Sequence, residues 1–165
     1  MPANIPDALD AGPNVHPAIQ VFGQGTQNYT CVLVDAGTPV PAWSAAVPEA
    51  NLYECDADGG ALVGTHFGGP TWQWDFDGST FVGDKPHGTS VASPDDPPTD
   101  VAWLLLPRKG GSDAGVMSTI VYAQRVSTVG GQVGNQDAGC DFAAADAGLV
   151  VKVPYSATYI FYESN

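Results

Sequence analysis

Short apolar and aromatic runs recur along the chain at intervals of about ten residues, separated mostly by Gly, Pro, Asp and Asn. Runs of this length between turn residues are typical of β-strands. The runs interpreted as strands are residues 19–22, 28–34, 42–46, 51–55, 61–67, 71–76, 80–82, 101–106, 116–126, 149–153 and 157–162. One helical turn is expected at 142–146, and no helix longer than two turns. The pattern predicts an all-β fold, a single-domain antiparallel sandwich or barrel of about ten short strands.

The closing run of the chain, residues 153–162, is apolar or aromatic on both faces. Alternation along a strand puts Tyr155, Ala157, Tyr159 and Phe161 on one face, and Ser156, Thr158, Ile160 and Tyr162 on the other. A strand with one solvated face would be polar on that face. This run is therefore expected to lie in the centre of a sheet or near the end of a barrel.

The domain organisation follows from length and from the distribution of proline. A chain of 165 residues is typical of one domain. Four prolines and few large apolar groups in the first 17 residues predict an extended N-terminal arm at 1–17, followed by a single β domain at 18–165. The stretch 93–100, SPDDPPTD, is expected to be a surface loop because its prolines lack N–H donors. Residues 129–148 form a second long connection.

The charge of the chain indicates which classes of partner and which cellular compartment to expect. The chain has 18 acidic and 5 basic residues and a formal net charge of −13, so nucleic-acid binding, which depends on Lys and Arg, is not expected. No apolar run approaches the roughly 18 residues of a membrane span. Residues 1–14 lack the pattern of a signal peptide, which leaves a cytoplasmic protein or a mature exported chain. The scarcity of Lys and Arg favours a secreted, periplasmic or cell-surface protein.

Three cysteines, Cys31, Cys55 and Cys140, allow one disulfide and one free thiol. No C-x-x-C pair is present, which disfavours a zinc knuckle and a thioredoxin-type site.

The stretch GTHFGGPTWQWDFDGS, residues 64–79, concentrates side chains that bind ligands. Trp72 and Trp74 lie two positions apart and share one face of a strand. If that face is exposed, it offers a flat surface for a glycan or a small molecule; if it is buried, the tryptophans belong to the core. The candidate ligand-binding residues are His66, Trp72, Trp74 and Asp77.

A calcium site is an alternative in the acidic turns. Glu54, Asp56, Asp58 and Gly59 fall at positions 1, 3, 5 and 6 of an EF-hand loop, but position 12 is Thr65 and no helices flank the loop. A weaker calcium site would borrow Asp75 or Asp77. The candidate metal ligands are therefore Asp56, Asp58, Asp75 and Asp77, and no other cofactor is expected.

No complete catalytic constellation is present. The sequence lacks a G-x-S-x-G elbow, and the three histidines are not spaced as metal ligands on one strand. A dinucleotide site at Gly23-x-Gly25 would need a following helix, whereas a strand is predicted there. The sequence thus favours a non-enzymatic structural or ligand-binding module over a metal-dependent or acid–base enzyme centred on His66, with Asp75, Asp77 or His87 nearby.

The same stretch carries a family resemblance. GTHFGGPTW followed by DGS and VG resembles the G-T-H-[YF]-x-G-P-T-W signature of a family of uncharacterised exported proteins from bacteria and fungi. Further blocks agree in order: VFGQGTQNYTC, PEANLY, VAWLLLP, AQRVSTVGGQ, the Gly139-Cys140 pair and VPYSATYIFY. The resemblance covers about residues 15–162.

The resemblance implies export and a single all-β domain of unknown function. It also implies a disulfide between Cys31 and Cys140, with Cys55 as an addition. Some fungal members carry the label malate dehydrogenase, which this sequence does not support because it has no nucleotide-binding fingerprint and no helix to host one.

Overall fold

A computed structural model describes residues 5–35, 37–55, 60–96, 98–133 and 139–165. The strands are β1 (Val15–Asp35), β2 (Pro39–Trp43), β3 (Val47–Tyr53), β4 (Leu62–Phe67), β5 (Thr71–Trp74), β6 (Thr80–Gly83), β7 (Thr89–Val91), β8 (Trp103–Gly111), β9 (Ile120–Gly130) and β10 (Val150–Ser164). The helical elements are α1 (Phe142–Asp146) and the 3₁₀ turns η1 (Asp7–Leu9), η2 (Lys85–His87) and η3 (Val116–Ser118). The prediction of an all-β fold is confirmed, and so is the helical turn at 142–146.

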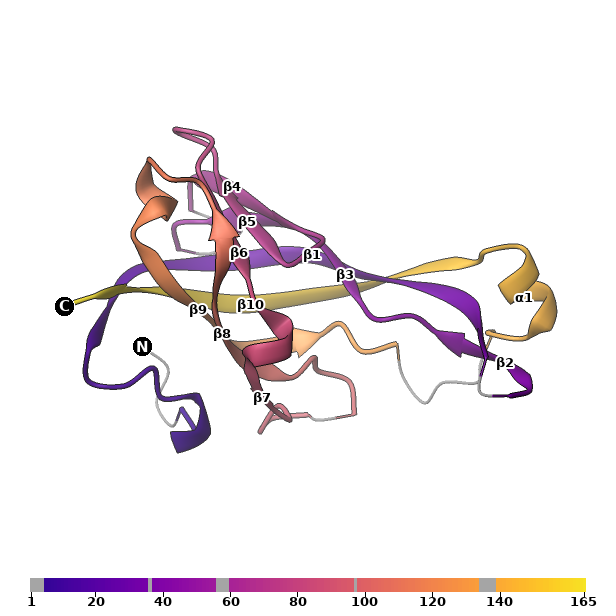
Figure 1. The fold of residues 1–165 in the computed structure, drawn as a ribbon. Coiled ribbons are helices and arrows are strands. Elements are labelled where there is room, and N and C mark those ends of the chain that lie inside the picture. Colours follow the sequence, from indigo (N-terminus) through magenta and orange to yellow (C-terminus); the bar gives the residue numbers. More distant parts are fainter. Residues whose placement is uncertain (1–4, 36, 56–59, 97, 134–138) are drawn as a thin grey trace.

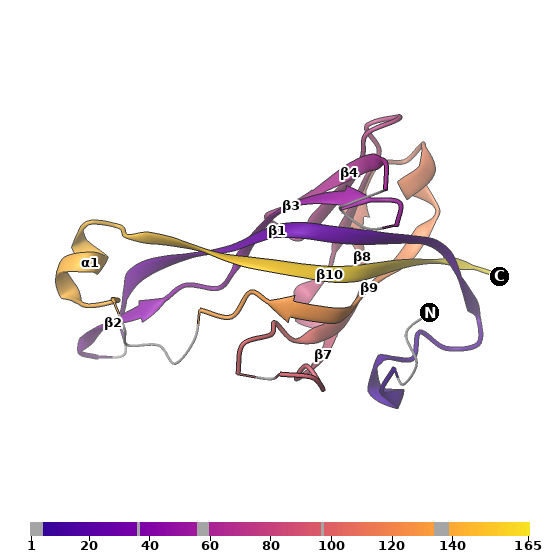
Figure 2. The same ribbon diagram turned by 180° about the vertical axis from the view of Figure 1, so that it is seen from behind.

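The sheet closes on itself. Its strands are hydrogen-bonded in the order β10-β9-β8-β6-β5-β4-β3-β1-β2, and an additional β1–β10 pairing joins the two halves. All of the pairings are antiparallel. β2 pairs only with β1, and β7 pairs only with β8, so these two strands lie outside the closed part of the sheet. The other eight of the ten described strands form a ring (Figures 1 and 2). Closure of this kind leaves the strands of the ring without a free edge.

The pairing of β1 with β10 is the longest in the molecule. It runs from Val15 opposite Ser164 to Thr30 opposite Val150. In the ring, β1 also pairs with β3 over residues 22–28, and farther along it pairs with β2 over residues 31–35. The β1–β10 ribbon therefore extends out of the ring as an arm, with β2 and α1 at its far end (Figure 1). The predicted strands 19–22 and 28–34 are thus parts of one strand.

A disulfide joins Cys31 on β1 to Cys140 just before α1, as the family resemblance implied. Cys31 is fully buried, while Cys55 is an exposed free thiol. The bridge joins the residues just before α1 to the arm formed by β1 and β10, and so fixes the C-terminal part of the connection 129–148.

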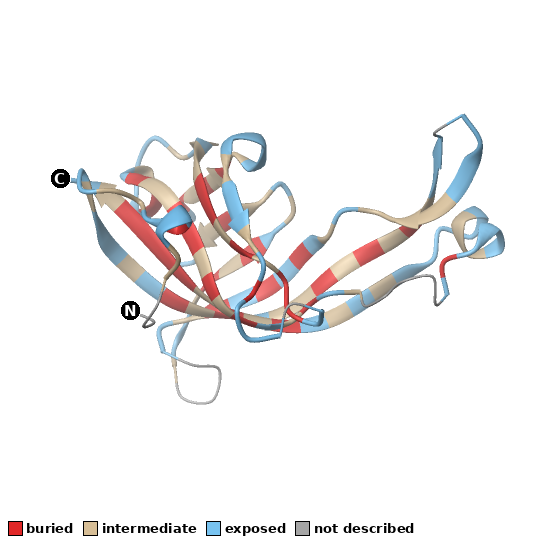
Figure 3. Cartoon of the chain, turned by 90° about the horizontal axis from the view of Figure 1, so that it is seen from below, coloured by how far each residue is buried: buried red, intermediate tan, exposed pale blue. Residues whose placement is uncertain are grey.

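The interior of the ring is the main core, and buried residues alternate with exposed ones along its strands (Figure 3). Large aromatic side chains fill it, among them Trp72, Phe81, Tyr159 and Phe161. Gly23 on β1 makes room for one of them, because a Cβ there would lie 2.5 Å from the Tyr159 ring. The Gly23-x-Gly25 sequence therefore lies within continuous β1, where the missing side chain of Gly23 serves packing.

A second core lies outside the ring, where the N-terminal segment covers β8, β9 and β10. Leu9 is fully buried there against Ile160 and Tyr162, and Gln124 Nε2 donates a 2.7 Å hydrogen bond to Leu9 O. This cover explains the closing strand: Tyr159 faces the inside of the ring, while Ile160 faces the N-terminal segment. Both faces of β10 are packed, as its pattern predicted.

The disulfide is expected to stabilise the whole fold. It closes a loop with a sequence separation of 109 residues, for which the chain-entropy treatment gives roughly 4–5 kcal/mol. The double variant Cys31→Ala/Cys140→Ala should lose about that much free energy of unfolding, measured by urea denaturation. Cys55→Ala is the matched control and should leave the midpoint unchanged. A double variant as stable as the wild type would contradict this role.

Candidate functional site: a cavity inside the closed sheet

A tight hairpin at Gly68–Pro70 places His66 and Trp72 side by side. β4 and β5 pair in a register that sets His66 opposite Trp72 and Phe67 opposite Thr71. Gly69 has φ +95°, a left-handed conformation that glycine adopts without strain. Because cross-strand neighbours point to the same face, both rings enter the interior of the ring.

His66 is held there as a neutral imidazole. Its ring stacks on Trp72 with centroids 4.1 Å apart and an interplanar angle of 7°. Nδ1 lies 2.8 Å from the carbonyl oxygen of Thr71, and because a carbonyl only accepts, Nδ1 carries the proton and Nε2 is left as an acceptor. Complete burial is the main cause that lowers the pKa of His66 to about 3, and the charges of Arg125 and Lys85 add to this effect.

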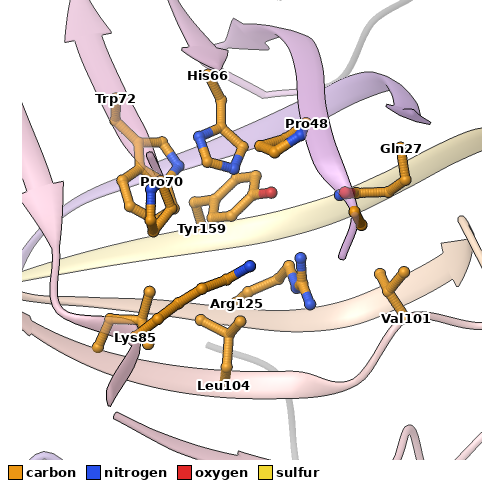
Figure 4. Close-up of a pocket in the computed structure, with 12 residues that line it drawn as sticks. Gln27, Pro48, His66, Pro70, Trp72, Lys85, Val101, Leu104, Arg125 and Tyr159 are labelled. Carbon is orange, nitrogen blue, oxygen red and sulfur yellow. The ribbon is translucent and has the colours of Figure 1, made fainter. Parts of the chain in front are cut away.

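Beside His66 lies a cavity of about 70 Å³, which we call the inner cavity. It is lined by Gln27, Ala46, Pro48, His66, Pro70, Trp72, Lys85, Val101, Leu104, Leu106, Arg125 and Tyr159. Figure 4 shows the ammonium of Lys85, the guanidinium of Arg125, the hydroxyl of Tyr159 and the ring of His66 turned toward the same space. Among the residues that the structure describes, the lining contains two cations and no carboxylate.

Arg125 is fixed by the backbone. Its Nε and Nη2 donate to the carbonyl oxygen of Ala102 at 3.1 and 2.8 Å. These bonds use two of the five N–H donors of the guanidinium. Cross-strand pairing places Arg125 between Leu104 on β8 and Tyr159 on β10, so all three side chains lie in one row on the inner face. A charged residue is thereby built into the wall of an otherwise apolar interior.

Lys85 comes from η2 and reaches the inner cavity from its rim. Partial burial lowers the pKa of its ammonium, and the charge of Arg125 lowers it further. Among the described residues, neither Lys85 nor Arg125 forms an ion pair. Two positive charges therefore lie near each other without a compensating anion from the described part of the protein.

Two buried donors in the lining also lack partners. Gln27 Nε2 and Trp72 Nε1 make no hydrogen bond among the described residues, although the two side chains are only 2% and 1% exposed. An unpaired buried N–H costs about 1–3 kcal/mol, so such groups usually have a partner in the functional state of a protein.

A second depression adjoins the inner cavity. This outer groove, of about 320 Å³, is lined by Lys85, Gly88, Thr89, Ser90, Ala102, Leu104, Leu106 and Arg125. Lys85, Leu104, Leu106 and Arg125 line both spaces. The shared residues put the two cations at the junction between the outer groove and the inner cavity.

The other predicted site residues that the structure describes do not line the inner cavity. Trp72 is almost completely buried and Trp74 packs, partly buried, against the core, so the two tryptophans do not form a flat outer surface. Asp77 caps backbone instead: its carboxylate accepts from Ser79 N at 2.9 Å and from Val116 N at 2.7 Å. Asp75 is exposed.

The acidic turn proposed for calcium is only partly described. Asp56 and Asp58 lie outside the described residues. Within the described part of the chain, no group of three or more His, Cys, Asp or Glu side chains is arranged to hold a metal ion.

Sequence reasoning found His66 and Trp72 but missed the polar half of the cavity. Gln27, Lys85 and Arg125 come from β1, η2 and β9, and no local motif links them. Of these three residues, only Arg125 stands out in the sequence, because it is a charged residue within an apolar run that is predicted to be a strand. The alternation along the closing strand puts Tyr159 on a face with other aromatic residues, but only the closure of the sheet brings that face next to His66.

The fold and the cavity together define a class: a disulfide-linked, closed antiparallel β protein with a small cavity inside the sheet. The chain belongs to the family described as protein of unknown function DUF3455, whose match covers residues 11–163. Comparison with curated proteins and with solved structures found no match. No helix in the described part of the chain is long and apolar enough to cross a membrane.

The low pKa of His66 makes folding sensitive to acid. Between pH 6.5, its ordinary pKa, and about 3, the unfolded chain binds a proton at His66 that the folded protein does not. The free energy of unfolding should therefore fall with decreasing pH across this window, with His66 contributing up to about 1.4 kcal/mol per pH unit.

The measurement is urea unfolding of wild type and His66→Gln at several values between pH 7 and 4. Other groups titrate in both proteins, so the difference between their slopes isolates His66. The wild type should show the steeper loss, because His66→Gln lacks the buried imidazole. Equal slopes for wild type and His66→Gln would contradict a neutral buried imidazole.

Proposed function

We propose that this protein is an exported, non-enzymatic module that binds a small molecule in the inner cavity beside His66. The observation that carries the proposal is the pair of buried, unpartnered donors, Gln27 Nε2 and Trp72 Nε1, in a cavity wall that also holds Lys85 and Arg125. Binding sites of this kind combine apolar walls with a few converging polar groups.

The outer groove supports the proposal because it supplies a route. A closed sheet encloses its interior, so a ligand needs an opening between elements. The outer groove meets the inner cavity at Lys85 and Leu104, where η2 and β8 lie next to each other. A small molecule entering there would reach His66 and Trp72 without unfolding a strand of the ring.

The chemistry of His66 favours binding over catalysis. A general base works best when its pKa lies near the working pH, and burial holds the pKa of His66 at about 3. Among the described residues, Asp77 is engaged with backbone amides and His87 Nδ1 lies 2.7 Å from Asp84 Oδ2. An acid–base dyad on His66 would need a carboxylate, and none lines the cavity in the described part of the chain.

Two further observations support parts of the proposal. Disulfides persist in oxidising compartments, so the Cys31–Cys140 bridge favours export to the periplasm, the cell surface or the medium. The antiparallel sheet lacks the parallel βαβ unit of dinucleotide-binding folds in its described part, which argues against the malate dehydrogenase label that the resemblance carries.

Blocking the inner cavity should abolish small-molecule binding. Ala46 lines the cavity without supplying any of its polar groups, so Ala46→Trp should fill the space and leave the charges in place. A library of small water-soluble fragments can be screened against the wild type by ligand-observed NMR. Fragments that bind the wild type should lose their signal with Ala46→Trp.

Ala45→Trp is the matched control, because Ala45 is exposed, precedes Ala46 and does not line the cavity. It should bind the same fragments as the wild type. Fragments bound equally by all three proteins would place binding elsewhere, and a screen without any binder would overturn the proposed function.

A further inference from the structure

We infer that the ligand of the inner cavity is a small organic carboxylate, whose carboxylate group lies between Lys85 and Arg125. The inference rests on the proposed function and adds the chemical class of the ligand. The charges, the free donors and the dimensions of the site support it.

The distribution of charge around the inner cavity favours an anion. The chain has only 5 basic residues against 18 acidic ones, yet Lys85 and Arg125 both line one cavity, whose described lining residues include no carboxylate. Nearby like charges in a partly buried site repel each other, and an anion placed between them would remove that repulsion. Arg108, in contrast, is satisfied by the carbonyl oxygens of Met117, Ile120 and Ser112.

The free donors suit a carboxylate. Nε and one Nη2 proton of Arg125 donate to Ala102 O, which leaves the edge formed by Nη1 and the second Nη2 proton beside the Tyr159 hydroxyl, with which Arg125 also interacts. That edge can donate two parallel hydrogen bonds to the oxygens of a carboxylate. Lys85 adds up to three donors and Gln27 Nε2 adds an unpartnered one, so both oxygens have donors on more than one side.

The dimensions limit the size of the acid. A cavity of about 150 Å³ holds benzene, whereas the inner cavity measures about 70 Å³ and in proportion has room for about three non-hydrogen atoms, the size of a carboxylate group. A longer chain would continue past Leu104 and Leu106 into the outer groove of about 320 Å³. Both leucines offer it an apolar wall.

The test compares butyrate with butyramide, a neutral compound of nearly the same shape. Binding is followed by the shift of the Trp72 indole N–H in ¹H–¹⁵N spectra, at pH 7 and constant ionic strength. The wild type should bind butyrate at least tenfold more tightly than butyramide. Lys85→Met should weaken butyrate about tenfold and butyramide much less, because only butyrate loses an attraction between opposite charges.

Lys109→Met is the matched control, because it removes the same charge from an exposed residue outside the cavity, and it should behave as the wild type. Equal binding of butyrate and butyramide, with both lost in Ala46→Trp, would overturn the carboxylate and leave the small-molecule site standing. Inorganic phosphate binding more tightly than butyrate would also overturn it. If neither compound shifts the Trp72 signal, the carboxylate is excluded, and the fragment screen still decides the broader proposal.

Discussion

The hydrogen bonding between β1 and β10 is the constraint on which the rest of the structure depends. It joins the two ends of the sheet and so turns a row of strands into a ring. Without it, β10 would be an edge strand, and the inner face carrying Tyr159 and Phe161 would lack its second wall. Because the paired strands come from opposite ends of the chain, closure depends on contacts between residues far apart in sequence, which are entropically costly to form. The Cys31–Cys140 bridge lies on this same ribbon and reduces that cost.

Closure also explains why polar groups occur inside. A ring of eight strands has an interior just wide enough for side chains or for one small ligand. Here Trp72, Phe81 and Phe161 fill part of it with tilted ring contacts, and the cavity occupies the remainder beside His66. The neutral imidazole fits such a place because it stacks as an aromatic ring while its N–H is satisfied by Thr71.

The sequence predicted the strands, the turn residues between them and the closing strand that is packed on both faces, because each of these depends on neighbours within about ten residues. It predicted His66 and Trp72 as site residues for the same reason, since one tight turn pairs them. Closure of the sheet, and with it the meeting of Gln27, Lys85 and Arg125, could not be predicted, because register between distant strands leaves no local pattern. Asp77 has a role that the local pattern did not indicate: it was predicted as a ligand-binding residue, and in the structure its carboxylate completes a turn and holds η3.

The charge of the whole protein and the charge of its cavity act at different ranges. A net charge of −13 repels small anions from the surface, but salt screens that repulsion beyond about 8 Å under physiological conditions. Arg125 on the inner face of the ring and Lys85 at the rim of the cavity would act on an anion at contact distance, where attraction is screened less than over about 8 Å. Selection for an anion would therefore occur at the junction of the outer groove and the inner cavity. The acidic surface then maintains solubility and lowers the rate of anion entry without removing the affinity of the site.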